Sequence, residues 1–426
     1  MKRKKIFILL ILIVMLFSLS GCYDSRGIEE LVYVTALGLD ASDGNEIILT
    51  LQISIPSSSS GSGSSQGSKT DNITVKCSNI DAGIALANSS ISKEINLSHC
   101  KVIIISEKLA SMGISKYIDT LINNIEVRPD CNVVICRCTA KDFIKNAKPS
   151  LETITTRYYE VAVKSSEYTG YTTSAELVDF AGSIKNSFIQ ASSILSGINY
   201  ANHFNSGASS NSSTNNNVKP SNSSQSTDSS PSIDNDFVAG ETPIDGTDNI
   251  EAFGTAVFYN DRLVGELNGI ETICHLLVSN KLKSCNISIP DIYNSNSNIE
   301  LRLMQKKDSK IDVELVNGTA YISVEVFLEG YGLSLDENID YNSDDTLDLI
   351  NSNAENYLEH QIEDYLYRTS KELNSDIDGF GKNILSEYKT LPEWFGSSWL
   401  ENYRKSFFKV RAHVNIKSGS EFNKSP

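Results

Sequence analysis

The hydrophobic and polar positions of the chain form three kinds of pattern. One unbroken apolar run of 12 residues, 6–17, lies near the start. Beyond it, short alternating runs typical of strands are interspersed with segments whose apolar positions recur about every 3.6 residues, as in helices. Two stretches, 56–69 and 205–236, consist mainly of Ser, Asn and Gly. We expect flexible loops there, because such segments bury too little apolar surface to form a core.

The part before residue 150 predicts alternating strands and helices. The runs 31–39 and 45–55 flank the turn residues Asp43 and Gly44, which predicts a hairpin. The further elements expected are a helix capped by Asp81 and ending near Ser90, a buried strand at 101–106, one helix over 107–126, a strand at 131–138 and a helix at 139–148. This order indicates an α/β arrangement up to about residue 150.

The middle of the chain gives a less regular pattern. Thr173 and Glu176 have the spacing of a capping box before a helix at 177–186. A second hairpin is expected to turn at Asn260 and Asp261. After it, the residues predict a helix over 269–280 and an extended segment over 284–290.

The last part of the chain gives the clearest signals. Asn317 and Gly318 lie between alternating runs, which is the strongest short-range sign of a hairpin. An amphipathic helix follows from about Asp344 to Leu373, and we expect it to cover one face of a sheet rather than to bind a partner. The final strand, 407–417, has one apolar face: Val410, Ala412, Val414 and Ile416.

Together these elements predict a mixed α/β or α+β protein of three domains. Each domain would be built on a mixed or antiparallel sheet with packed helices. The expected bounds are 22–150, 151–294, which contains the loop 205–236, and 295–426.

The apolar run near the start predicts a signal peptide rather than a membrane span. It follows four positive residues, 2–5, and its 12 residues fall short of the roughly 20 that a spanning helix needs. "LSGC", Leu19 to Cys22, resembles the lipobox of bacterial lipoproteins, and an ordinary signal peptide with a chance cysteine is the alternative. The resemblance implies cleavage after residue 21 and a diacylglyceryl group on the Cys22 thiol.

Charge narrows the choice of partners. The formal net charge is −16, and loss of residues 1–21, which carry four positive and no negative charges, would make it −20. Such a surface disfavours nucleic acid, whose phosphates attract basic proteins, and anionic lipid headgroups. Membrane contact would therefore depend on the lipid, whose two acyl chains suffice for stable anchoring.

Candidate chemistry is sparse. The chain has no G-x-S-x-G, H-E-x-x-H or P-loop motif, and we predict neither an enzyme nor a cofactor. "GFGKNI", 379–384, is interpreted as a tight helix entry packed by Phe380, and His360 with Glu363 as a solvated pair. The cysteines 131, 136 and 138 are interpreted as small buried thiols, and a zinc site completed by Cys100 is the alternative.

Several segments together resemble the C-subunit lipoproteins of bacterial spore germinant receptors, the GerAC or Ger(x)C type. The segment 97–114 is similar to the second block of that family and 254–272 to its middle block. Its C-terminal block is matched by 379–384, Tyr388, Trp394, Trp399 and the closing strand. The N-terminal match consists of Cys22, Tyr23, Asp24, Arg26, Glu30, Val34, Gly38 and Asp40.

This resemblance implies a fold and a function. The expected fold is three mixed α/β domains. The expected role is a subunit on the outer face of the spore inner membrane, in a receptor with integral-membrane A and B subunits that answers small nutrients. The alternative is a solute-binding lipoprotein of a transporter, which would usually have two similar lobes and a longer tether after its cysteine. A lipid-anchored enzyme is a third class, and no triad or metal set in the sequence supports it.

Overall fold

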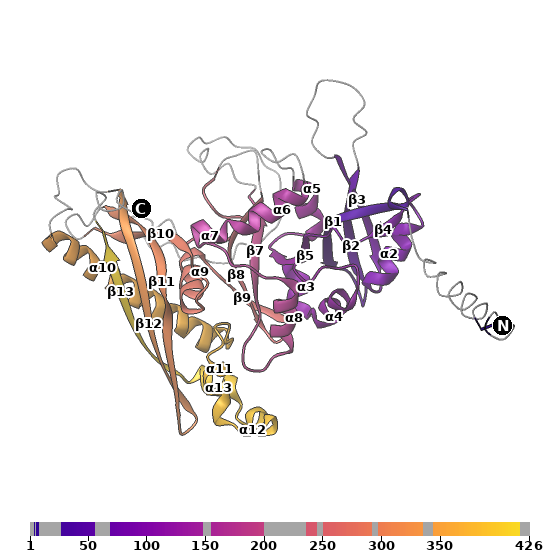
Figure 1. Ribbon diagram of the computed structural model, residues 1–426. Coiled ribbons are helices and arrows are strands. Elements are labelled where there is room, and N and C mark those ends of the chain that lie inside the picture. The colour runs from indigo at the N-terminus through magenta and orange to yellow at the C-terminus, as the bar shows by residue number, and fades with distance from the viewer. Residues whose placement is uncertain are drawn as a thin grey trace, which may run out of the picture.

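The structure is a computed structural model. It describes residues 4, 6–7, 27–55, 69–147, 155–199, 236–244, 250–291, 297–334 and 344–417. Cys22 and the loops 56–68 and 205–235 lie outside these ranges. Two sheets with packed helices make up the described part (Figure 1). No helix among the described residues is long and apolar enough to cross a membrane.

The larger sheet has nine strands and runs through the first two-thirds of the chain. Its order is β3-β2-β1-β5-β6-β7-β8-β9, and β4 pairs with β1. The central strands β1, β5, β6 and β7 pair in parallel, and antiparallel hairpins extend the sheet on both sides. The strands are β1 Leu31–Ala41, β2 Ile47–Ile55, β3 Lys69–Cys77, β4 Glu94–Asn96, β5 Val102–Ser106, β6 Asn132–Cys136, β7 Ser192–Ile198, β8 Ile250–Tyr259 and β9 Arg262–Leu267.

Helices cover both faces of this sheet, because its central strands are apolar on both sides. In β5, Ile103 and Ile105 contribute to one core, and Val102 and Ile104 contribute to the other. The first core receives α2 Ile80–Asn88, α3 Glu107–Met112, α4 Ser115–Asn123 and α8 Leu177–Lys185. The second receives α5 Ala140–Asn146 and α6 Thr155–Lys164, and the short helix α7, Ser166–Thr169, follows.

Gly38 and Asp40 seat α5 against β1. A Cβ at Gly38 would lie 2.8 Å from Ile144 Cδ1, so the helix approaches closely because the side chain is absent. The Asp40 carboxylate accepts the Ala140 N–H at 2.7 Å and the Lys141 N–H at 3.0 Å, which satisfies free donors of the first helical turn. The Gly-x-Asp at the end of the first strand therefore has a structural role.

The second sheet has four strands in the order β10-β11-β12-β13. One face carries its core, which α9 and α10 complete. The elements are α9 Gly269–Val278, β10 Ser284–Pro290, β11 Asn298–Val316, β12 Thr319–Ser334, α10 Asp344–Tyr367, the π turn Arg368–Glu372, α11 Gly381–Ile384, the 3-10 turn Leu385–Glu387, α12 Leu391–Gly396, α13 Trp399–Arg404 and β13 Phe407–Ile416.

Side chains of α10 hydrogen-bond the backbone of the edge strand β13. Asn351, Glu355 and Glu359 accept the N–H groups of Ile416, Val414 and Ala412 at 2.8, 3.0 and 3.0 Å. Four helical residues rise about 6.0 Å and two strand residues about 6.6 Å, so the two repeats stay in step. The helix therefore occupies the place of a further strand and satisfies donors that an edge strand leaves free.

The mixed α/β class is confirmed, and the described strands form two sheets rather than three. We expected a separate sheet before and after residue 150. Instead β6 pairs with β7, so one sheet continues through that position. The segment 151–294 thus supplies β7, β8 and β9 to the large sheet, and α9 and β10 to the core of the small one.

Some helix bounds and caps differ from those expected from the sequence, and each difference has a local cause. The helix expected over 107–126 is two helices, because Gly113 has a φ of +105° and the next N–H, that of Ile114, donates to Asp261 O. Asn79, not Asp81, caps α2 by accepting the Ala82 N–H at 2.8 Å. Thr173 and Glu176 do not form a capping box: α8 begins at Leu177, so Glu176 is the N-cap residue, and its side chain makes no capping hydrogen bond.

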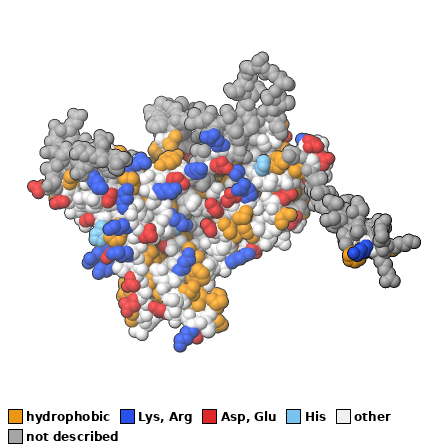
Figure 2. Space-filling view, in the orientation of Figure 1, with side chains coloured by type: hydrophobic (Ala, Val, Ile, Leu, Met, Phe, Trp, Pro, Cys, Tyr) orange, Lys and Arg blue, Asp and Glu red, His pale blue; other side chains and the backbone are white. Residues whose placement is uncertain are grey.

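The hairpins at residues 260–261 and 317–318 and the long helix α10 lie where we expected them. In Figure 2, acidic and basic side chains are interspersed on the visible face rather than gathered by sign.

Candidate functional site between the two sheets

A buried histidine connects the large sheet with the C-terminal unit. His275 lies on α9, and its side chain is 1% exposed. Its Nδ1 lies 2.8 Å from Asp378 Oδ1, and Tyr365 of α10 donates its hydroxyl to Asp378 Oδ2 at 2.7 Å. On the other side of the ring, Nε2 lies 3.4 Å from Ser192 Oγ, in the first residue of β7. Four side chains from distant parts of the sequence thus form one chain of contacts.

The hydrogen-bond pattern assigns donors and acceptors along this chain. The Asp378 carboxylate accepts from Tyr365, so the His275 Nδ1 that faces it carries a proton. On the other side of the ring, the Ser192 hydroxyl can donate to Nε2 or accept from it. Burial raises the pKa of the Tyr365 phenol well above its usual range, which keeps that donor protonated.

The order serine, histidine, aspartate is also that of a hydrolase triad. In a triad, the imidazole accepts the serine proton and the carboxylate holds the ring in one tautomer. Here the Ser192–His275 distance is longer than the range of about 2.6–3.2 Å for a working pair. The four side chains also satisfy one another, which is the usual requirement for polar groups inside a core. A structural role therefore accounts for the whole arrangement.

Sequence reasoning missed this cluster. The five histidines lie far apart in the sequence, and the local pattern around His275 includes neither Ser192 nor Asp378. The available signal was the position of His275 inside the apolar run 273–278, because a histidine buried on such a helix needs a polar partner.

A second buried carboxylate organises the loop that carries Asp378. Asp376 accepts the N–H groups of Gly379, Phe380 and Gly381 at 2.8, 3.0 and 2.9 Å, and the Trp399 indole N–H at 2.8 Å. Burial raises the pKa of Asp376 to about 6, against the lowering effect of these bonds. Phe380 is 1% exposed, as the interpretation of "GFGKNI" as a packed helix entry requires.

Two hydrogen bonds attach this loop to the hairpin side of the large sheet. Gln190 N–H donates to Asp376 O at 2.8 Å, and the Ser375 hydroxyl donates to Phe258 O at 2.6 Å. The loop 375–381 is therefore a rigid junction between the two sheets.

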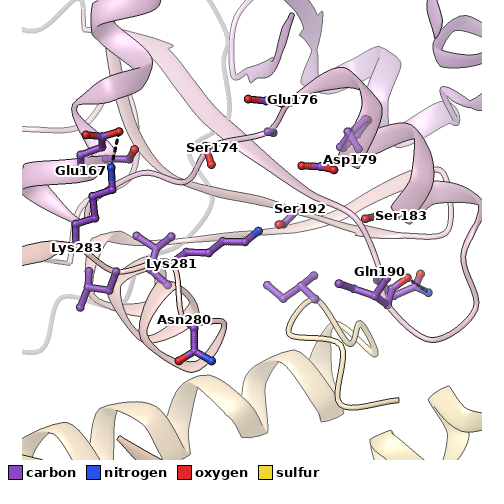
Figure 3. A pocket seen from close by; sticks show the side chains of 17 residues that line it. Glu167, Ser174, Glu176, Asp179, Ser183, Gln190, Ser192, Asn280, Lys281 and Lys283 are labelled. Atoms are coloured by element: carbon purple, nitrogen blue, oxygen red, sulfur yellow. Dashed lines mark hydrogen bonds and ion pairs between the residues drawn. The ribbon is translucent and has the colours of Figure 1, made fainter. Parts of the chain in front are cut away.

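A cavity of about 490 Å³ lies on the Ser192 side of this junction. Its charged and polar lining includes Glu176 and Asp179 from the start of α8, and Lys281 from the turn after α9 (Figure 3). Lys283 also lines it and pairs with Glu167 at 2.8 Å. The apolar part of the wall is made by Phe180, Ile189, Leu276, Leu282 and Ile377.

The cysteines and His360, which were the other candidates from the sequence, do not form a common site in the described part of the chain. Cys131 Sγ lies 3.9 Å from Cys100 Sγ in one core, while Cys136 lies in the core on the other face of the sheet and donates to Cys138 O at 3.0 Å. Within the described ranges, no three His, Cys, Asp or Glu side chains gather as a metal site would require. His360 is exposed and pairs with Asp364 at 3.4 Å rather than with Glu363.

Comparison with known proteins gives consistent matches. Residues 24–198 match the family described as spore germination protein N-terminal domain, and residues 253–419 match the one described as spore germination B3/GerAC like, C-terminal.

Two curated proteins of Bacillus subtilis (strain 168) are similar to the chain. Spore germination protein KC is 24% identical over 152 residues, which cover 34% of this chain and about a third (37%) of that protein. Putative spore germination protein YfkR is 20% identical over 430 residues, which cover 99% of each.

Among solved structures, the crystal structure of the GerBC protein matches with a TM-score of 0.50. Its identity is 15%, and the match covers 89% of this chain and 96% of that one. At this identity the match supports the fold alone.

Proposed function

Because the chain belongs to the GerAC-like family of spore germination proteins, we propose that it is the C subunit of a germinant receptor, anchored by a diacylglyceryl group on Cys22. In this proposal it lies on the outer face of the spore inner membrane and works by contact with integral-membrane A and B subunits. The observation that carries the role is the pair of family matches, which together span most of the chain. The observation that carries the anchor is "LSGC" directly after the apolar run.

The short tether supports a contact role. The described fold begins at Gly27, and the first turn, Ile28–Glu30, leads directly into β1. About six residues separate Cys22 from this turn, which is at most roughly 20 Å of extended chain. A lipid on Cys22 would hold the large sheet against the membrane surface and raise its effective concentration near partners there. The net charge of −20 expected after cleavage favours partners with basic outer loops.

The solute-binding alternative receives no comparable support. Such a protein would usually consist of two similar lobes, whereas the two sheets here differ in strand number and topology.

The anchor is tested by mass spectrometry of the N-terminus of the protein isolated from spore membranes. We expect a diacylglyceryl cysteine at position 22, and release or lack of processing in the Cys22→Ala variant. An unmodified N-terminus beyond residue 22, or retention of residues 6–17, would contradict the anchor.

The contact role is tested with a flexible linker of about 20 residues inserted after Tyr23, whose typical end-to-end distance is about 25 Å. The matched control carries the same linker inside 205–236. We expect weaker nutrient-triggered germination and weaker co-purification of membrane subunits with the first insertion than with the second. Equal germination in both, with no membrane protein recovered, would refute the contact role.

A further inference from the structure

We propose that Cys100 and Cys131 are a site of disulfide formation, where a disulfide compound oxidises the two thiols and a bond forms between their sulfur atoms. Both are free thiols in the structure, and their Sγ atoms lie 3.9 Å apart. This inference goes beyond the anchor and the partners proposed above. It requires only residues that the structure describes and holds whether or not Cys22 is lipidated.

The fold brings the two sulfur atoms together from the starts of two neighbouring strands. Cys100 comes just before β5, and Cys131 directly precedes β6. These strands pair in parallel, and the Asn132 N–H donates to Lys101 O at 3.0 Å, which extends the pairing toward the cysteines. Neighbouring strands lie about 4.8 Å apart, within the Cα separations of about 4.4–6.8 Å that a disulfide bridges. The bond can therefore form with little change in the backbone.

The two thiols also share one environment, which the neighbouring cysteines do not. Cys100 and Cys131 are each 1% exposed, and both belong to the core that α3 and α4 cover. Cys136 lies in the core on the other face of the sheet and donates to Cys138 O. A bridge between Cys136 and Cys138, only two residues apart in the chain, would be strained. The geometry therefore selects Cys100 as the partner of Cys131.

The hydrogen bond between the thiols sets the order of the reaction. The Cys131 S–H donates to Cys100 Sγ, and this bond together with burial raises the pKa of the Cys131 thiol well above its usual range. Cys131 therefore keeps its proton, and Cys100 is the attacking group, because a thiolate there would accept the Cys131 S–H. The Cys100 thiolate attacks the disulfide compound, which forms a mixed disulfide and releases one thiolate.

The second step closes the internal bond. Cys131 loses its proton and attacks the Cys100 sulfur of the mixed disulfide, and the second thiolate leaves. The two cysteines together lose two electrons and two protons. The disulfide compound takes up both electrons, and its two thiolates take up the protons and leave as thiols.

Local opening gives access to the pair, and closure of the bond stabilises the fold. His99 and Asp130, the residues beside the two cysteines, are exposed, and the Cys100 N–H donates to Leu97 O at 2.9 Å in the turn that covers the site. Such a turn opens at a lower free energy than the whole protein unfolds. The bond joins positions 31 residues apart, across α3 and α4, and would reduce the entropy of the unfolded chain.

The test is refolding of the purified full chain in a mixture of oxidised and reduced glutathione, followed by trapping of free thiols and peptide mapping. Trypsin should release Cys100 in peptide 94–101 and Cys131 in peptide 117–137. We expect these two peptides to be linked in most molecules, with the mass of two hydrogen atoms lost, and to separate on reduction with dithiothreitol. Recovery of Cys100 and Cys131 only as free thiols or glutathione adducts would overturn the proposal.

Variants assign the bond, since peptide 117–137 also contains Cys136. Cys136→Ala and Cys136→Ser should keep the linked peptides, whereas Cys100→Ala and Cys131→Ala should each abolish them. Oxidation should raise the midpoint of thermal unfolding of the Cys136 variants by about 3–8 °C and leave that of Cys131→Ala unchanged. Linked peptides that survive Cys131→Ala, or that disappear in both Cys136 variants, would overturn the proposed pairing. A midpoint that oxidation leaves unaltered or lowers would overturn the stabilising effect.

Discussion

At the scale of single residues, two His–Asp pairs in this protein differ in burial. His275 and Asp378 have side chains that are 1% and 0% exposed, whereas His360 and Asp364 are 71% and 65% exposed. The first pair is removed from water and fully bonded, and the second is solvated on the outside of α10. The same chemical change at the two positions should therefore have different costs.

We expect His275→Ala to lower the free energy of unfolding by roughly 3–5 kcal/mol, because it leaves the Asp378 carboxylate buried with one donor fewer. His360→Ala should cost less than about 1 kcal/mol, as is usual for exposed pairs. Chemical denaturation of the two variants measures the difference. A loss at His275 as small as that at His360 would contradict the importance of the buried chain.

The residue scale also marks the limit of what the sequence could predict. The packed role of Phe380 and the apolar face of the last strand follow from local pattern, and both are found. The contacts of His275 with Ser192 and Asp378 join positions that are 83 and 103 residues apart, so no local periodicity contains them. The partners of His275 can be identified only when the relative position of the two sheets is known.

At the scale of elements, the contact between α10 and β13 depends on matched spacing. Asn351, Glu355 and Glu359 recur every four residues along the helix, and the N–H groups that they accept recur every two residues along the strand. The apolar side of α10 predicts a helix that covers a sheet, and its polar side gives no local sign of the strand that lies beside it. The repeat N-x-x-x-E-x-x-x-E was the available signal, but its meaning depended on which strand lay beside it.

We expect Glu355→Ala and Glu359→Ala each to lower the free energy of unfolding by about 1.5–3 kcal/mol, the range for hydrogen bonds to charged groups. Glu363→Ala, one helical step further, is the control, since no such bond links Glu363 to β13 within the described ranges. Urea denaturation of the three variants gives the comparison. A loss at Glu363 equal to the other two would show that general helix effects, not the contacts with β13, decide the outcome.

At the scale of the whole molecule, the continuous sheet determines what can fold alone. The core on one face of the large sheet draws on Leu37 and Ile103 from before residue 150, and on Phe180, Leu195 and Phe258 from after it. The sequence pattern placed a domain boundary at 150 because the α/β alternation weakens there. Pairing between β6 and β7 is a long-range contact that no turn residue announces.

We expect a fragment of residues 22–150 to show no cooperative thermal unfolding and to be digested rapidly by protease. It would expose the β6 edge and lack much of one core, whereas the full chain should unfold cooperatively under the same conditions. Circular dichroism during heating, with limited proteolysis, distinguishes the two. A sharp transition in the fragment would show that the first unit is an independent domain.

The position of β1 has a mechanical consequence. This strand lies inside the large sheet, with β2 on one side and β5 on the other, and the N-terminal segment leads straight into it. Tension on that segment would pull β1 along its own length and load the hydrogen bonds on both sides in shear. Those bonds must then break together rather than one after another, as they would if a hairpin were peeled from its end. Force applied through the proposed tether would therefore load β1 in shear.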